Sequence, residues 1–150
     1  MIKVSVVMPV KNAAAFVEKS INSVLNQSLA EIELICVDDC SEDESLSIMK
    51  AAEAKDSRVK VITFDSVSGA AKARKDGILM SAGKYLMFLD ADDYLEPDAC
   101  EFLYHAMEKE QTDILHFSAA VEDFGAGRER TGRMSRFVEP FEGKLEGEQV

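Results

Sequence analysis

One short segment constrains the fold of this chain more than any other. Residues 85–89 form a run of five apolar or aromatic side chains without Gly or Pro, and Asp90, Asp92 and Asp93 follow it at once. A run of this kind predicts a strand that is buried on both faces, as in a parallel sheet. The carboxylates then lie at the carboxyl end of that strand.

These carboxylates repel one another unless a positive charge lies between them. A hard divalent cation with oxygen ligands meets that requirement. Asp90 and Asp92 point the same way only if the chain stays extended after the strand, and Asp93 then points away. The alternative is structural, because Asp92 or Asp93 could simply cap the following helix.

The rest of the chain alternates between strand and helix patterns. The predicted strands cover residues 3–10, 32–37, 59–64, 85–89 and 113–117. The predicted helices, with apolar side chains at helical spacing, cover residues 16–25, 42–55, 70–81 and 97–108. This alternation predicts an α/β fold of three layers (α/β/α) around a largely parallel sheet. Asn12 is expected to cap the first helix, and Ser41 with Glu44 fits a capping box for the second.

Composition limits the class of protein. A chain of 150 residues suggests one domain. The net charge of −11 argues against a nucleic-acid-binding face, although it leaves a local phosphate site open. No segment approaches the ~20 apolar residues of a membrane span and no signal peptide is recognisable, so a cytoplasmic location is expected. The three cysteines are expected to be reduced, because their spacing with the two histidines is not that of a zinc site.

The pattern changes near residue 121. Glycines and arginines crowd residues 125–136, and no clear period follows. We therefore expect residues 1–120 to form a core, and residues 121–150 to be a loop or the truncated start of another part. The arginines are either solvated or belong to a basic loop that closes over phosphate.

Polar residues collect at the carboxyl ends of three predicted strands. They are residues 9–12, the pair Asp38 and Asp39, and residues 90–93. In a parallel α/β sheet, ligands bind outside these ends, where the strand order reverses. Structural alternatives remain, because Asn12 could be only a helix cap and Asp38 and Asp39 could only stabilise the next helix. Arg74 either faces an anion or is a solvated helix charge.

The chain also resembles a known family. Five segments match in order and spacing the nucleotide-sugar-binding half of family 2 glycosyltransferases, inverting enzymes with the Rossmann-like GT-A fold: residues 4–12, 23–28, 33–43, 73–77 and 83–93. The resemblance covers about residues 3–118. It implies a nucleotide-sugar site made of Pro9, Val10, Lys11, Asn12, Asp38, Asp39, Arg74, Asp90 and Ala91.

The resemblance also implies individual roles. The segment from Pro9 to Lys11 would line the nucleobase pocket, and Asp39, with Asp38 beside it, would hydrogen-bond the uracil or ribose. Residues 90–92 look like the DxD motif of the family. There Asp92 would bind Mn²⁺ or Mg²⁺, Asp90 would contact the ribose or the metal through water, and Arg74 would order the site.

The resemblance implies an enzyme that transfers a sugar from a nucleotide-diphosphate sugar with inversion and with the help of a metal. The expected donor is a UDP-sugar. The acceptor would be a saccharide or a lipid-linked molecule in polysaccharide biosynthesis. In the family the acceptor-binding half carries the catalytic base, so no base is assigned here. Peripheral association of the full-length protein with the inner face of the membrane is also open.

Four positions depart from the usual family pattern. They are Lys11 for Tyr, Cys40 for Gly, Val67 for Asn and Lys75 for Asn. They leave a second interpretation open, a silent nucleotide-sugar-binding domain or pseudo-enzyme. A signalling receiver domain is a third and weaker interpretation. That fold has its acidic pair after the first strand, whereas here the pair follows the second predicted strand.

Overall fold

A computed structural model describes residues 1–115 and 117 of the chain. Within this part the strands are β1 (Val4–Val10), β2 (Ile32–Asp38), β3 (Val59–Thr63) and β4 (Tyr85–Phe88). The helices are α1 (Val17–Leu25), α2 (Ser45–Lys55), α3 (Ala70–Met80) and α4 (Ala99–Glu110). Met1–Tyr104 form one compact unit, which contains every site discussed below.

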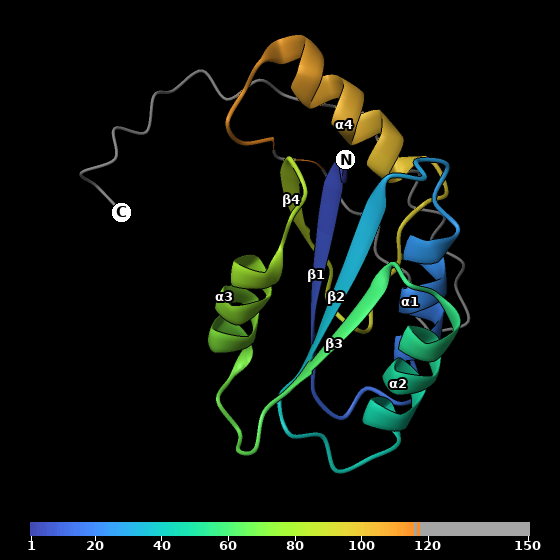
Figure 1. Ribbon diagram of the computed structural model, residues 1–150, viewed down its shortest axis with the longest axis vertical. Coiled ribbons are helices and arrows are strands. Elements are labelled where there is room, and N and C mark those ends of the chain that lie inside the picture. Colours follow the sequence, from blue (N-terminus) through green and yellow to red (C-terminus); the bar gives the residue numbers. More distant parts are fainter. Residues whose placement is uncertain (116, 118–150) are drawn as a thin grey trace, which may run out of the picture. The chain divides into compact units, whose positions relative to one another are not determined.

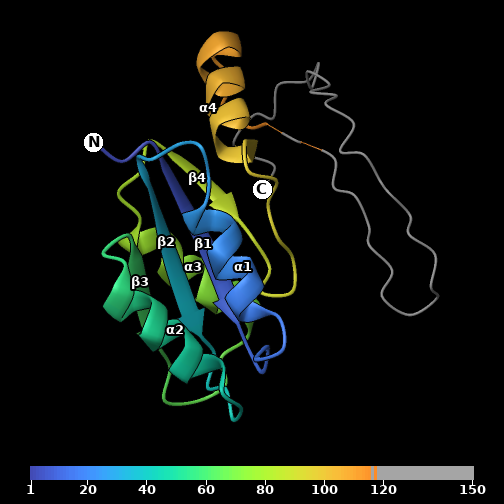
Figure 2. The ribbon, with the colours of Figure 1, turned by 90° about the vertical axis from the view of Figure 1, so that its right-hand side faces the viewer.

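The four strands form one parallel sheet in the order β3-β2-β1-β4. Helix α3 covers one face of the sheet, and α1 and α2 cover the other (Figures 1 and 2). The predicted three-layer α/β fold is therefore confirmed. None of the described helices is long and apolar enough to span a membrane.

Strands β1 and β2 lie at the centre of the sheet, and all residues of β2 are buried. On the α3 side, Val7, Ile35, Val37 and Ala73 form a core cluster. Helix α3 approaches β1 very closely at Gly77, where an added Cβ would lie 2.3 Å from Cγ1 of Val7. This close approach is what the small residues of α3 make possible.

A buried polar network closes the amino-terminal end of the sheet. The Glu33 side chain is only 2% exposed, and its Oε1 accepts hydrogen bonds from Ser5 Oγ (2.6 Å) and the Ala82 amide (2.7 Å). Its Oε2 accepts one from Lys60 Nζ at 2.7 Å. The Ser5 hydroxyl in turn accepts the Gly83 amide at 2.8 Å. The network therefore joins three strands to the turn before β4, with its polar groups paired.

Two strand predictions were wrong. Strand β4 is not buried on both faces, since Leu86 is 41% and Phe88 44% exposed. Among the described residues, β4 pairs only with β1, so it is an edge strand there. The fifth predicted strand does not form at residues 113–115 or 117, where Ile114 is 71% exposed. His116 lies outside the described residues.

The predicted capping box is also wrong. Helix α2 begins at Ser45 and has no side-chain cap from Glu44. Instead, Oδ1 of Asp43 accepts the Ser45 amide at 2.9 Å. The reason is that Ser41 is used elsewhere, as described below. The predicted division at residue 120, and the segment 121–150, fall outside the described residues and stay predictions.

Candidate nucleotide-binding site

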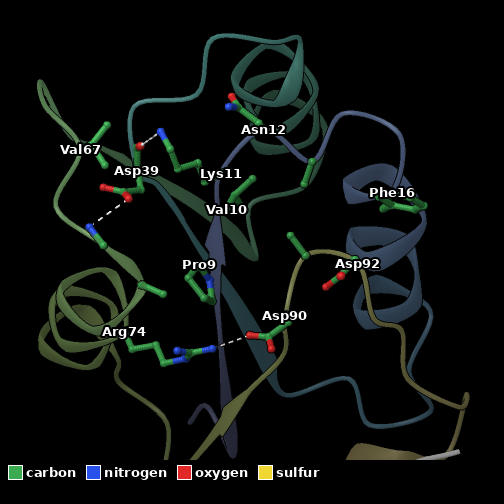
Figure 3. A pocket seen from close by; sticks show the side chains of 14 residues that line it. Pro9, Val10, Lys11, Asn12, Phe16, Asp39, Val67, Arg74, Asp90 and Asp92 are labelled. Atoms are coloured by element: carbon green, nitrogen blue, oxygen red, sulfur yellow. Dashed lines mark hydrogen bonds and ion pairs between the residues drawn. The ribbon is translucent and has the colours of Figure 1, made fainter. Parts of the chain in front are cut away.

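A pocket of about 580 Å³ opens at the carboxyl ends of the strands (Figure 3). It is lined by Pro9, Val10, Lys11, Asn12, Ala13, Phe16, Asp39, Val67, Gly69, Ala70, Arg74, Asp90, Ala91 and Asp92. These include every residue predicted for the site except Asp38. The structure thus brings together residues that lie up to about eighty positions apart in the sequence.

The topology explains the position of this pocket. From β1 the sheet continues to β2 and β3 on one side and to β4 on the other. The strand order therefore reverses between β1 and β4, and the loops that leave these strands diverge. The pocket lies at this reversal, between residues 9–13 after β1 and residues 90–92 after β4.

The loop after β1 is fastened to the loop after β2. Lys11 Nζ donates to the carbonyl oxygens of Asp39 (3.0 Å) and Cys40 (3.2 Å). Asn12 does not cap α1, which contradicts the prediction. Its side-chain Oδ1 accepts a hydrogen bond from the backbone amide of Glu42 at 2.8 Å, and its backbone amide donates to Ser41 Oγ at 3.0 Å.

Cys40 explains one departure from the family pattern. Its φ is 59°, in the left-handed region where glycine has the lowest cost. The usual Gly after the acidic pair therefore meets a backbone requirement. In this chain a cysteine meets the same requirement at some cost in strain.

Asp39 and Asp38 point to different partners. Asp39 is 4% exposed, and its carboxylate accepts the amides of Ser68 (2.6 Å) and Gly69 (3.0 Å). It therefore anchors the loop before α3, and each oxygen keeps a further lone pair for a ligand. Asp38 is 2% exposed and does not line the pocket. It accepts the Ser41 amide at 3.2 Å instead.

The acidic segment after β4 is a turn, so the extended chain stated above as the condition for Asp90 and Asp92 to point the same way does not form. The Asp93 amide donates to the Asp90 carbonyl at 3.0 Å. Even so, Asp90 and Asp92 both line the pocket, while Asp93 does not. Burial and the negative charges of Asp92 and Asp90 raise the pKa of Asp93. This turn concentrates negative charge, as a cation site would require.

Arg74 faces this turn and is not merely a solvated charge. Its Nη2 lies 2.5 Å from Asp90 Oδ1, although the two side chains are 36% and 53% exposed. A pair this exposed contributes little to stability. It does hold a guanidinium at the edge of the pocket, where a phosphate group could share its donors.

The donor set fits a hard divalent cation in part. Asp90 and Asp92 supply carboxylate oxygens from one turn, which suits Mn²⁺ or Mg²⁺ and leaves coordination positions for phosphate and water. Residues 1–115 and 117 contain no group of three or more His, Cys, Asp or Glu side chains arranged to hold a metal. The described part of the chain therefore offers the carboxylates of Asp90 and Asp92 at this turn, and phosphate and water would complete the coordination.

Sequence reasoning missed several residues that line the pocket. Phe16 is the clearest case, since it precedes α1, is 49% exposed and lines the pocket, whereas Val17 enters the core. Two neighbouring apolar residues cannot share one helix face, which was the available signal. Val67, 62% exposed, was named only as a departure from the family pattern, and it lines the pocket because Asp39 binds the loop that follows it. That contact left no local signal.

Relatives of this chain are named as glycosyltransferases. A protein of Haemophilus influenzae, named as an uncharacterized glycosyltransferase, is 38% identical over 120 residues, which are 80% of this chain and 48% of that protein. UDP-Glc:alpha-D-GlcNAc-diphosphoundecaprenol beta-1,3-glucosyltransferase WfgD of Escherichia coli is 35% identical over 113 residues, 75% of this chain and 44% of WfgD. This chain thus spans less than half of either relative.

Solved structures agree with the fold. The structure of S. aureus TarS 1-349 in complex with UDP-GlcNAc superposes with a TM-score of 0.70 at 28% identity, covering 75% of this chain and 33% of that one. The complex of the same protein with UDP gives a TM-score of 0.69. The expected GT-A fold is confirmed. The model of the family Glycosyl transferase family 2 matches residues 5–148, so this chain is a member of glycosyl transferase family 2.

Proposed function

We propose that this chain forms the donor site of an inverting glycosyltransferase that takes a sugar from a UDP-linked donor with the help of Mn²⁺ or Mg²⁺. The observation that carries the proposal is the pocket at the strand-order reversal. Asp39 and Lys11 lie on one side of it, and Arg74, Asp90 and Asp92 lie on the other (Figure 3).

The nucleobase and ribose would bind beside Pro9, Val10, Lys11 and Asp39. Lys11 uses two of its three donors on backbone carbonyls, so one is left for a carbonyl of the base. Asp39 is held in place by two amides and still has acceptor capacity for a base N–H. Asn12 and Ala91 would shape the pocket around the ribose and diphosphate.

The diphosphate would lie along the acidic turn. There Asp92 would hold the cation directly, Asp90 would contact the ribose or the cation through water, and Arg74 would donate to phosphate oxygens. A divalent ion bound there supplies Lewis-acid stabilisation of the charge that develops on the leaving diphosphate. Without a ligand, Arg74 pairs with Oδ1 of Asp90. If Arg74 moved to a phosphate, this oxygen would be free to bind the ribose or the cation through water.

The relatives support the choice of donor and acceptor class. TarS 1-349 is described in complexes with UDP and UDP-GlcNAc, and WfgD is named for a UDP-Glc donor and a diphosphoundecaprenol-linked acceptor. We therefore propose a UDP-sugar donor and a saccharide or lipid-linked acceptor for the whole protein. The catalytic base is proposed to lie in sequence that these relatives have and this chain does not span.

A silent nucleotide-sugar-binding domain is the competing function. It is not favoured, because the matching relatives are named as glycosyltransferases. A transfer assay on a longer form that includes the acceptor-binding half would distinguish the two. Sugar released from UDP-sugar only in the presence of acceptor is the expected result, and metal-dependent UDP binding without any transfer would favour the silent domain.

The direct test is a calorimetric titration of UDP into this chain with Mn²⁺ and then with EDTA. We expect binding that EDTA weakens, and we expect Asp92→Asn to remove the metal-dependent part, a loss of roughly tenfold or more. Asp65→Asn, at an exposed carboxylate outside the pocket, is the matched control. Equal affinity with and without EDTA would refute the metal role, and no binding in either condition would refute the donor site.

A further inference from the structure

Helix α1 and the residues just beyond it carry a row of polar side chains that point toward the protein interior. Ser20, 1% exposed, and Ser23, half-buried, lie on one face of α1, and Gln27, 7% exposed, lies two residues past the end of the helix. Spacings of three and four residues place side chains next to one another along a helix. Such a buried polar row needs hydrogen-bond partners, and its partners identify what it does.

The row reaches the segment that connects β4 to α4. Ser23 Oγ accepts the Leu95 amide at 3.1 Å. Gln27 Nε2 donates to the Glu96 carbonyl at 2.6 Å, and its Oε1 accepts the Cys100 amide at 2.8 Å. This connecting segment has no helix or strand of its own before Ala99. Ser23 of α1 and Gln27 just after it therefore supply partners that regular structure would otherwise provide.

Ser20 is the member of the row that touches the acidic turn. Its hydroxyl oxygen lies 2.7 Å from the carbonyl oxygen of Ala91 and 2.5 Å from that of Asp93. One hydroxyl has one proton, so it donates to one carbonyl at a time. Both carbonyls nevertheless converge on this hydroxyl. These carbonyls belong to the residues before and after Asp92, so the Ser20 hydroxyl contacts the backbone on both sides of it.

We infer that Ser20 is a positioning residue. By holding the backbone of the acidic turn, it orients the carboxylate of Asp92 for binding the divalent cation. The inference rests on the proposed function, because it concerns the same metal-binding turn. Metal affinity depends on the groups that orient the ligands as well as on the ligands themselves. Within the described residues, the turn has three exposed carboxylates, Asp90, Asp92 and Asp93, and one backbone bond of its own, from the Asp93 amide to the Asp90 carbonyl, so it needs such a support.

The test compares Ser20→Ala with Ser23→Ala, two identical truncations one helical turn apart. Both remove a hydroxyl that contacts the segment after β4, but only Ser20 contacts the acidic turn. Mn²⁺ affinity is measured by electron paramagnetic resonance in the presence of UDP, and UDP affinity is measured separately in EDTA. Exchange rates of the Asp93 amide hydrogen are measured by NMR without any ligand.

We expect Ser20→Ala to weaken Mn²⁺ binding roughly tenfold, at the low end for a group that orients a metal ligand. UDP affinity in EDTA should stay unchanged, and exchange of the Asp93 amide should become faster. Ser23→Ala should leave Mn²⁺ affinity and the Asp93 amide as they are in the unsubstituted chain. Ser20→Cys is a second variant if alanine prevents folding, because the larger sulfur cannot approach the two carbonyls as closely and should weaken Mn²⁺ in the same direction.

The outcomes separate this inference from the proposed function. If the unsubstituted chain binds UDP without any metal dependence, the proposed metal role fails and the positioning role fails with it. If binding is metal-dependent but Ser20→Ala keeps full Mn²⁺ affinity, only the positioning role is refuted. Equal weakening by Ser20→Ala and Ser23→Ala would also refute it, since the effect would then be general loosening of the segment.

Discussion

Replacing Glu33 by Gln tests the buried network that joins the strands at the amino-terminal end of the sheet. The carboxylate accepts three hydrogen bonds, from Ser5, Ala82 and Lys60, at 2.6 to 2.7 Å. In Glu33→Gln the amide oxygen keeps the Ser5 and Ala82 bonds, now as neutral ones. The amide nitrogen faces the Lys60 ammonium, and because both are donors that bond is lost.

The magnitude follows from these contacts. A hydrogen bond to a charged group contributes about 1.5–3 kcal/mol and a neutral one about 1 kcal/mol, so at the lower end of that range weakening two bonds costs about 1 kcal/mol in total. The bond to Lys60 adds about 1 kcal/mol, a value discounted for solvent because that side chain is 43% exposed. We therefore expect Glu33→Gln to lower the free energy of unfolding by about 2 kcal/mol at neutral pH.

The loss should depend on pH in a defined direction. Burial by itself raises the pKa of Glu33, but the hydrogen bonds from Lys60, Ser5 and the Ala82 amide, with the charge of Lys60, lower it below its usual 4.5. A lowered pKa stabilises the fold above the unfolded value, and the stabilisation is lost as pH falls through the folded value. The difference between the unsubstituted chain and Glu33→Gln should therefore shrink in acid.

Urea unfolding followed by circular dichroism, at neutral pH and at about pH 3.5, measures this difference. Glu44→Gln, at an exposed carboxylate of the loop before α2, is the control and should change stability little at either pH. A loss below about 0.5 kcal/mol at neutral pH, the range of ordinary surface substitutions, would refute the reasoning. So would a loss that is equally large in acid, because the charge would then not be its source.

Three further predictions follow from close contacts in the fold and the pocket. Gly77→Ala should lower the free energy of unfolding, measured in urea, by about 1–2 kcal/mol, because the cost of the clash between the new methyl group and Val7 exceeds the gain in helix propensity. Val7→Ala in the same chain should recover part of the loss, and full stability of Gly77→Ala alone would contradict this. Cys40→Gly should be about 1 kcal/mol more stable than Cys40→Ala, because φ is 59° there, and equal stability in the same assay would show that this conformation is not strained. Lys11→Met should weaken UDP binding in calorimetry by removing the contact with the Asp39 carbonyl. Lys11→Tyr loses the same contact but offers a ring for the base to stack on, worth about 1–3 kcal/mol, so it should bind UDP more tightly than Lys11→Met; unchanged affinity in both would place the base elsewhere.

Local patterns predicted the elements of this fold well, and distant partners account for the errors. The apolar run before Asp90 was predicted as a strand, and β4 forms there. Its burial was misjudged, because an apolar run does not say whether the strand lies at the centre or the edge of the sheet. Helix caps failed for a related reason. Asn12 is of a residue type that commonly caps helices, but its hydrogen-bond partner is Glu42, thirty residues later in another loop.

The candidate site shows the same division between local and distant information. The carboxyl ends of parallel strands meet at one edge of a sheet, so the sequence alone predicted that residues 9–12, the pair Asp38 and Asp39, and residues 90–93 would collect there. Of these, Asp38 and Asp93 do not line the pocket. The sequence did not predict that Asp38 would turn inward to the Ser41 amide, because two neighbouring acidic residues look alike until the chain direction is known. It also gave no sign that Ser20 would support the acidic turn.

Periodicity and residue type therefore determined the class of fold and the alternation of elements, because these depend on interactions within a few positions. They also placed several polar residues at the carboxyl ends of the strands, where the pocket lies. Only the tertiary structure decided where each polar side chain points and which groups it hydrogen-bonds. Glu33, Asp39 and Ser20 show why, since each bonds to groups 27 to 73 residues away. Contacts over such distances exist only once the sheet has formed, and no local pattern in the sequence encodes them.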